Sequence, residues 1–119
     1  MEGSKTEEKV RLSRTDADRI LRGYGKMAEA LRSSGTLGTA FGLGECFDET
    51  ALVAQMYDLR SRVLSVEDTR ERLLLYSHYI KGMSLEACAS LLNKSRRTVY
   101  RLKNRALDSF IKIMERKNV

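Results

Sequence analysis

Residues 82–107, GMSLEACASLLNKSRRTVYRLKNRAL, decide the fold of this chain, because they predict two short helices joined by a tight turn. Ser84 is a good N-cap for the first helix. Asn93 tolerates the left-handed conformation that ends a helix, and Ser95 can cap the next one. Helical spacing gives each helix one apolar face. The apolar residues are Leu85, Cys88, Ala89 and Leu92, then Val99, Leu102, Ala106, Phe110 and Ile113.

This arrangement matches a helix-turn-helix, whose second helix shows side chains to DNA near its N-terminus while an apolar stripe holds it on the domain. Ala89 supplies a small residue where the helices cross. The turn departs from the usual pattern, which carries Gly, because it holds Asn93 and then Lys94. The alternative is an amphipathic helical hairpin with a solvated basic face. The second helix carries these residues off its apolar line: Arg96, Arg97, Tyr100, Arg101, Lys103, Asn104 and Arg105.

Positive charge is concentrated at the C-terminal end of the chain. Residues 93–119 hold nine Lys and Arg against two acids, a net charge of +7. Residues 1–92 hold 13 basic and 14 acidic residues, a net charge of −1. A local field of positive sign attracts polyanions, and nucleic acid is the commonest of these. An anionic membrane surface is another, but the basic helix needs its other face for packing.

Length and composition favour one all-α domain with an extra helical arm. The chain has 119 residues and no Pro, and only Gly82 follows Gly44 among the glycines. These features favour helix over a turn-rich β fold. The sequence has no apolar run of membrane-span length and no signal-peptide core at its N-terminus, so we expect a cytoplasmic protein and no membrane partner.

Nothing in the sequence predicts catalysis or a bound cofactor. Two cysteines, Cys46 and Cys88, make no disulfide framework. His78 is the only histidine, so a zinc site would lack spaced ligands. The Gly-rich stretch 33–47 has no Gly-Lys-Ser/Thr ending and is not a phosphate-binding loop. We therefore expect no enzyme, no catalytic residue, no cofactor and no metal.

The N-terminal half predicts two helices joined by a loop. Residues 1–14 are polar and predicted to be flexible, and a helix is expected from Thr15, with Thr15 as its cap. A second helix is expected to start near Asp48. Each has an apolar seam: Ala17, Ile20, Tyr24, Met27 and Leu31 in the first, Leu52, Met56, Leu59 and Val63 in the second.

These two seams predict an antiparallel helical hairpin, or equally the interface of a homodimer through residues 15–64. Between them, the Gly-rich loop 33–47 carries the apolar residues Leu37, Phe41, Leu43 and Phe47, which either anchor the loop or bind a partner. A third helix, residues 69–81, is apolar on more than one side and is predicted to be the buried central helix, with Gly82 as its stop. The last helix is expected to run from Arg96 to about Glu115.

The segment from about Glu67 to Phe110 resembles region 4 of bacterial sigma-70-type sigma factors, which binds the promoter −35 element. It is also similar to small stand-alone regulators of phages and mobile elements that carry this region. The matching runs are RERLLLYSHYIKG, SLEACASLL and SRRTVYRLKNRALDSF, a little over a third of the chain. Residues 1–64 do not resemble the sigma region that binds the −10 element and core polymerase. The resemblance therefore implies a small regulator with a sigma region 4-like domain, and its last helix in the major groove.

The resemblance also implies which residues lie at DNA. By position it places Arg96, Arg97, Tyr100, Arg101 and Asn104 toward DNA, with Ser95 and Thr98 near the backbone. In the major groove Arg binds guanine and Asn binds adenine, each through two hydrogen bonds. Lys103, Arg105, Lys112 and Arg116 are expected to bind phosphates. Tyr100 is expected either to contact a phosphate or thymine methyl, or to pack on the helix surface.

We therefore expect residues 65–119 to be a helix-turn-helix domain that binds double-stranded DNA, with residues 96–107 as the recognition helix of a transcription regulator. Residues 15–64 are expected to hold a second copy or RNA polymerase. Two alternatives stay open: an accessory protein of phage DNA packaging, similar to a small terminase subunit, and a module that binds RNA polymerase or a sigma factor. The division of charge also predicts that deletion of residues 1–47 leaves a folded DNA-binding fragment.

Overall fold

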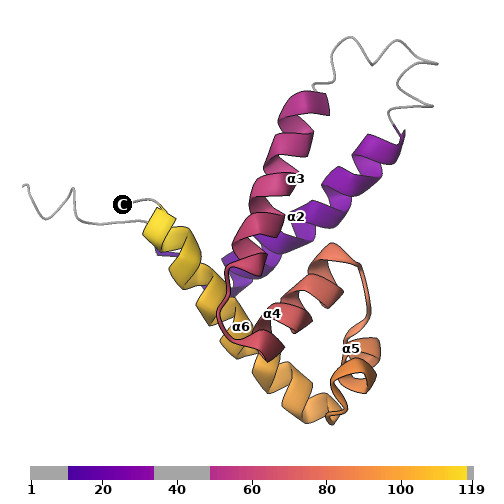
Figure 1. The fold of residues 1–119 in the computed structure, drawn as a ribbon, viewed down its shortest axis with the longest axis vertical. Helices are drawn as coiled ribbons and strands as arrows, with labels where there is room; N and C mark the ends of the chain where they lie inside the picture. The colour runs from indigo at the N-terminus through magenta and orange to yellow at the C-terminus, as the bar shows by residue number, and fades with distance from the viewer. Residues whose placement is uncertain (1–10, 34–48, 118–119) are drawn as a thin grey trace, which may run out of the picture.

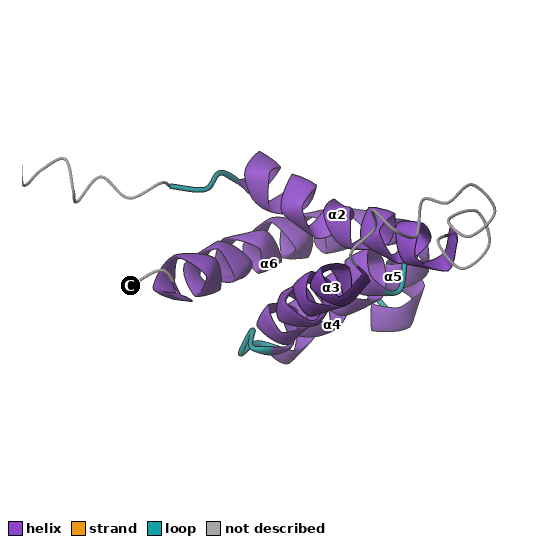
Figure 2. Ribbon diagram, turned by 90° about the horizontal axis from the view of Figure 1, so that it is seen from above, coloured by secondary structure: helices purple, strands orange, loops and turns teal. Residues whose placement is uncertain are grey.

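The computed structural model describes residues 11–33 and 49–117, and all regular structure in these two stretches is helical (Figure 1 and Figure 2). The expected all-α class is therefore confirmed for this part of the chain. The elements are α2 (Arg14–Ser33), α3 (Glu49–Leu64), α4 (Thr69–Leu75), the π-helix η3 (Tyr76–Ile80), α5 (Leu85–Leu92) and α6 (Arg96–Lys117).

Some of the predictions fall outside the described residues. The start of the second helix at Asp48 and almost all of the Gly-rich loop, with Leu37, Phe41, Leu43 and Phe47, lie outside them. So do the first ten residues of the predicted flexible N-terminus.

The first turn of α2 is capped by Ser13, and the prediction of Thr15 as its cap is wrong. The Ser13 hydroxyl accepts a hydrogen bond from the Asp16 backbone N–H at 3.1 Å. The Asp16 carboxylate accepts one from the Ser13 N–H at 3.0 Å. This hydrogen bond from the Ser13 backbone lowers the pKa of Asp16. Each residue accepts a hydrogen bond from the backbone N–H of the other, so the pair forms a capping box. The helix therefore starts at Arg14, one residue before Thr15.

The predicted third helix is present, but its second half is a π-helical turn. Asp68 caps α4 by accepting hydrogen bonds from the backbone N–H groups of Arg70 and Glu71, both at 3.0 Å. After Leu75 the helix widens into η3, and Gly82 follows with a φ of 78°. Leu74, Leu75 and Tyr79 of this helix are buried, and Leu73 is 38% exposed.

One hydrophobic core joins both halves of the chain. Helices α2 and α3 lie side by side and run in opposite directions, and the start of α2 lies against the C-terminal half of α6 (Figure 1). Side chains from α2, α3, η3 and α6 meet in one cluster, so the core crosses the predicted boundary between residues 64 and 65. Its buried members include Ala17, Leu21, Tyr24, Leu59, Val63, Leu75, Tyr79, Leu107, Phe110 and Ile113.

A second, smaller cluster fixes the N-terminal half of α6. Leu74 of α4, Cys88 of α5, and Val99 and Leu102 of α6 are buried together there. Cys88 is a free thiol, and burial raises its pKa. Because three helices contribute to this cluster, α5 and the start of α6 are held in a fixed relation to α4.

Candidate nucleic-acid interface

The turn between α5 and α6 has the conformation that the sequence predicts. Ser84 caps α5 by accepting a hydrogen bond from the Ala87 N–H at 3.1 Å. Asn93 has φ 57° and ψ 47°, the left-handed conformation expected for it. The Lys94 N–H then donates to the Ala89 carbonyl at 2.9 Å. These hydrogen bonds close the end of α5 and set the direction in which α6 leaves.

Ser95 caps the N-terminus of α6 with its hydroxyl. The Ser95 Oγ accepts a hydrogen bond from the Thr98 N–H at 3.2 Å and donates to the Thr98 Oγ1 at 3.0 Å. Both residues are exposed at the start of the helix. Their hydroxyls are therefore used in the cap of the helix.

Opposite its buried stripe, α6 presents a polar and basic surface. Successive residues are turned by about 100° around a helix, and Val99, Leu102 and Ala106 face the core. The residues on the opposite side are all exposed, and Tyr100 is 50% exposed. We call this surface the outer face of α6; it consists of Arg97, Tyr100, Arg101, Asn104 and Arg105.

Lys103 lies at the edge of α6 and not on its outer face. Its side chain is half-buried, and its Nζ lies 6.0 Å from the centre of the Tyr100 ring. Its charge also acts on His78 of η3, whose Nδ1–H donates to the Met83 carbonyl at 2.7 Å. Burial lowers the pKa of His78, and the charge of Lys103 lowers it further. The sequence analysis expects Lys103 to bind a phosphate, and the structure places this residue at the edge of the outer face, beside Tyr100.

Arg96 is held by a residue that the sequence did not assign to the site. Its Nη2 donates to the Glu86 Oε2 at 2.7 Å, so α6 is tied to the first turn of α5 across the turn. By contrast, Arg97 and Arg101 form no salt bridge within the described residues. These two guanidinium groups are therefore the free cations at the centre of the outer face.

The outer face continues along α6 to an acid, Asp108, which is paired with Arg14 of α2. The Arg14 Nε and Nη2 donate to the two carboxylate oxygens at 2.9 and 2.8 Å. The hydrogen bond from Arg14 lowers the pKa of Asp108. Sequence analysis missed this pair because 94 residues separate the partners and no local pattern joins them.

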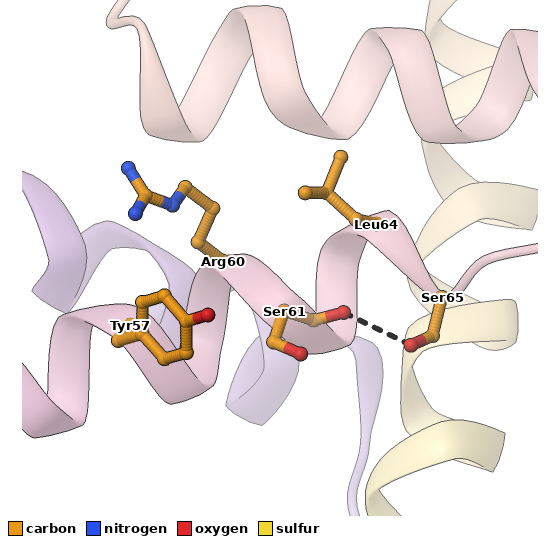
Figure 3. Close-up of a pocket in the computed structure, with 5 residues that line it drawn as sticks. All are labelled: Tyr57, Arg60, Ser61, Leu64 and Ser65. Atoms are coloured by element: carbon orange, nitrogen blue, oxygen red, sulfur yellow. Dashed lines mark hydrogen bonds between the residues drawn. The ribbon is translucent and has the colours of Figure 1, made fainter.

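A shallow pocket on α3 is the other surface feature that we considered as a site. It has a volume of about 460 Å³, and Figure 3 shows Arg60 and Leu64 on one side of the helix with Tyr57 beside them. The guanidinium of Arg60 lies 5.7 Å from the centre of the Tyr57 ring. Ser65 donates to the Ser61 carbonyl at 2.9 Å and completes the lining. This set contains no acid–base pair and no activated nucleophile.

Residues 11–33 and 49–117 contain neither a candidate metal centre nor a membrane-spanning helix. No group of three or more His, Cys, Asp or Glu side chains in these residues is placed to hold a metal ion. None of the helices there combines the length and apolarity that crossing a membrane requires. Comparisons of the chain with protein families, with curated proteins and with solved structures return no match.

Proposed function

We propose that α5, its turn and α6 form a helix-turn-helix that binds double-stranded DNA, and that the protein is a transcription regulator resembling sigma factor region 4. The observation that carries this proposal is the outer face of α6. It presents the free cations Arg97 and Arg101 on a helix whose opposite side is buried in two clusters. A rigid helix with cations near its N-terminus is what a recognition helix requires.

The chemistry of the outer face suits the edges of bases in the major groove. Arg97 and Arg101 lie about one turn apart, and each is free to donate two parallel hydrogen bonds to a guanine. Asn104 is placed one turn further along and can pair with adenine in the same way. Arg105, at the margin of the outer face, is better placed for a phosphate, which contributes affinity without sequence information.

Arg96 has a different role in this proposal from the one that the resemblance implies. Because its guanidinium is tied to Glu86 at 2.7 Å, a base contact by Arg96 requires that ion pair to open or to turn with it. We therefore assign base recognition first to Arg97 and Arg101.

The experiment compares two charge-matched double variants in binding to duplex DNA by fluorescence anisotropy. Arg97→Gln/Arg101→Gln removes two cations from the outer face, and Arg19→Gln/Arg32→Gln removes two exposed cations from α2. Duplexes that contain a site selected from a random library are measured beside random duplexes, over a range of salt concentrations. We expect the outer-face variant to lose at least about tenfold in affinity for the selected site and the α2 variant to lose much less.

Equal losses in the two variants would mean that net charge, and not the outer face, drives binding. No selectable site in the wild-type protein would exclude sequence-specific recognition. A shallow dependence on salt would exclude duplex DNA as the partner, because each neutralised phosphate adds about −0.9 to the log–log slope.

A second candidate function is association with another copy of the chain. Val53, Tyr57 and Leu64 are 48%, 65% and 52% exposed and recur at helical spacing on one side of α3. A dimer would place two copies of α6 on two half-sites of DNA, as two-fold symmetric helix-turn-helix proteins do. Sedimentation equilibrium of the wild type and of Tyr57→Ser/Leu64→Ser tests this, and a monomeric wild type on DNA and in solution would exclude it.

A further inference from the structure

Along α6, the outer face is followed by an acid, Asp108, at a position where DNA binding would disfavour one. Asp108 follows Asn104 by four residues and Arg101 by seven, so it lies in line with both on the helix. Asp108 is about 16 Å along the axis from Arg97, and the major groove is about 12 Å wide. If α6 crosses the groove with Arg97 at the base edges, Asp108 therefore lies at the edge of the groove, beside the phosphates.

Arg14 changes the chemistry of this position. It reaches across from the first turn of α2 and holds both carboxylate oxygens of Asp108, at 2.9 and 2.8 Å. The two side chains are 53% and 44% exposed, so the pair stands at the surface and is not buried between the helices. The start of α2 is itself fixed by the reciprocal hydrogen bonds of Ser13 and Asp16.

The ion pair with Asp108 leaves part of the Arg14 guanidinium available for another contact. Arginine has more N–H donors than a two-point clamp uses, and just over half of the Arg14 side chain is accessible to solvent. Arg–carboxylate pairs of this kind fix the plane of the guanidinium, so its remaining donors have a defined direction. Such a group at the edge of a groove is suited to a phosphate oxygen, to which Arg also binds.

We propose that Arg14, oriented by Asp108, binds a phosphate of the duplex, so that α2 forms one edge of the DNA interface. This inference rests on the proposed function of α6 and adds a contact from outside the segment 67–110 that resembles sigma region 4. Asp108 acts here as a positioning residue. The contact is to the backbone, so it contributes affinity equally on every sequence.

The test measures binding to the selected site and to random duplexes against salt for Arg14→Gln, Arg14→Gln/Asp108→Asn and Arg19→Gln. Arg19 is a matched control, because it is an exposed arginine of the same helix that lies close to an acid, Asp16, at 3.4 Å. An exposed ion pair adds little to stability, so all variants are expected to fold, and circular dichroism melts check this.

We expect Arg14→Gln to bind roughly tenfold more weakly on both kinds of duplex and to lose about 0.9 from the magnitude of the salt slope. The double variant should recover part of this loss, because Asp108→Asn removes a negative charge beside the phosphates, but it should stay weaker than the wild type. Arg19→Gln should match the wild type. Recovery of wild-type affinity in the double variant would overturn the proposal, because Arg14 would then only neutralise Asp108. An unchanged salt slope for Arg14→Gln would also overturn the proposal. If the wild type bound no DNA, the proposed function would be overturned as well.

Discussion

Asn93 is the residue whose backbone fixes the angle between α5 and α6. It is the only non-glycine residue with positive φ in the described part of the chain, at 57°. Asn adopts this conformation at low cost, whereas a β-branched residue does not. We expect Asn93→Val to lower the free energy of unfolding by about 1–2 kcal/mol, and Asn93→Gly to change it much less.

Urea denaturation of both Asn93 variants checks this expectation. The neighbouring Lys94→Val serves as a control, because Lys94 is exposed and its φ is not positive. If Asn93→Val and Lys94→Val have the same midpoint as the wild type, the left-handed turn does not constrain the two helices. If Asn93→Val is folded in the absence of denaturant but binds DNA more weakly than the wild type, the turn also orients α6 toward DNA.

His78 is a spectroscopic probe of the surroundings of η3. Burial lowers its pKa, and the charge of Lys103 lowers it further. Because His78 is the only histidine, its imidazole signals in a proton NMR titration are unambiguous. We expect a midpoint below the ordinary value of about 6.5, and a higher midpoint in Lys103→Gln, since that substitution removes a nearby positive charge.

The same shift has a defined effect on stability. A histidine with a lowered folded-state pKa binds its proton less readily in the folded state than in the unfolded one. The stabilisation is therefore complete above about pH 6.5 and is lost as the pH falls through the folded-state pKa. A midpoint at or above 6.5 in the wild type would show that the imidazole is neither desolvated nor next to Lys103.

At the scale of elements, a buried polar contact joins α4 to α6. Glu71 is 7% exposed, and the Ser109 hydroxyl donates a hydrogen bond to its Oε1 at 2.6 Å. Ser109→Ala leaves the carboxylate without this donor, which is expected to cost about 1–3 kcal/mol of stability. Ser90→Ala on the exposed side of α5 is the matched control and is expected to cost less than about 0.5 kcal/mol. Equal thermal and urea midpoints for the two variants would contradict this role.

Local sequence patterns predicted the helices and the turn between α5 and α6, because those features depend on neighbouring residues. Ser84 and Asn93 act as expected, and α6 begins at Arg96 as expected. The cap of α2 was misplaced because Thr15 and Ser13 both have capping side chains, and only Ser13 is paired with Asp16. The π-helical turn of η3 was not predicted, because apolar spacing does not distinguish it from an α-helix.

Contacts between distant residues could not be predicted in this way. Arg14 and Asp108 are 94 residues apart, and the Tyr79 hydroxyl donates to Asp18 across 61 residues. Such pairs follow from the packing of α2 against η3 and α6, which the sequence does not specify. The charge of the outer face was visible in the sequence, but the ion pair of Arg96 with Glu86 and the position of Lys103 beside Tyr100 required the structure.

At the scale of the whole molecule, the division of charge does not coincide with a division of the core. The net charge of −1 over residues 1–92 and +7 over residues 93–119 suggests two parts. However, Ala17, Leu21 and Tyr24 of α2 are buried in the same cluster as Phe110 of α6. Surface charge governs encounter with a polyanion, whereas folding follows buried apolar area, so the two need not have the same boundaries.

This shared core leads us to expect that the fragment lacking residues 1–47 does not fold cooperatively, the opposite of what the charge pattern suggested. Leu21 is fully buried between α2 and the rest of the core. The milder variant Leu21→Ala is expected to lose about 2–5 kcal/mol, a large part of the 5–15 kcal/mol that stabilises a typical domain. Met27→Ala, at a partly buried position of the same helix, is expected to lose less.

Urea denaturation and circular dichroism measure the stability of the fragment and of both variants. A fragment that unfolds with a sharp transition, together with a Leu21→Ala variant as stable as the wild type, would show that α6 is stabilised without α2.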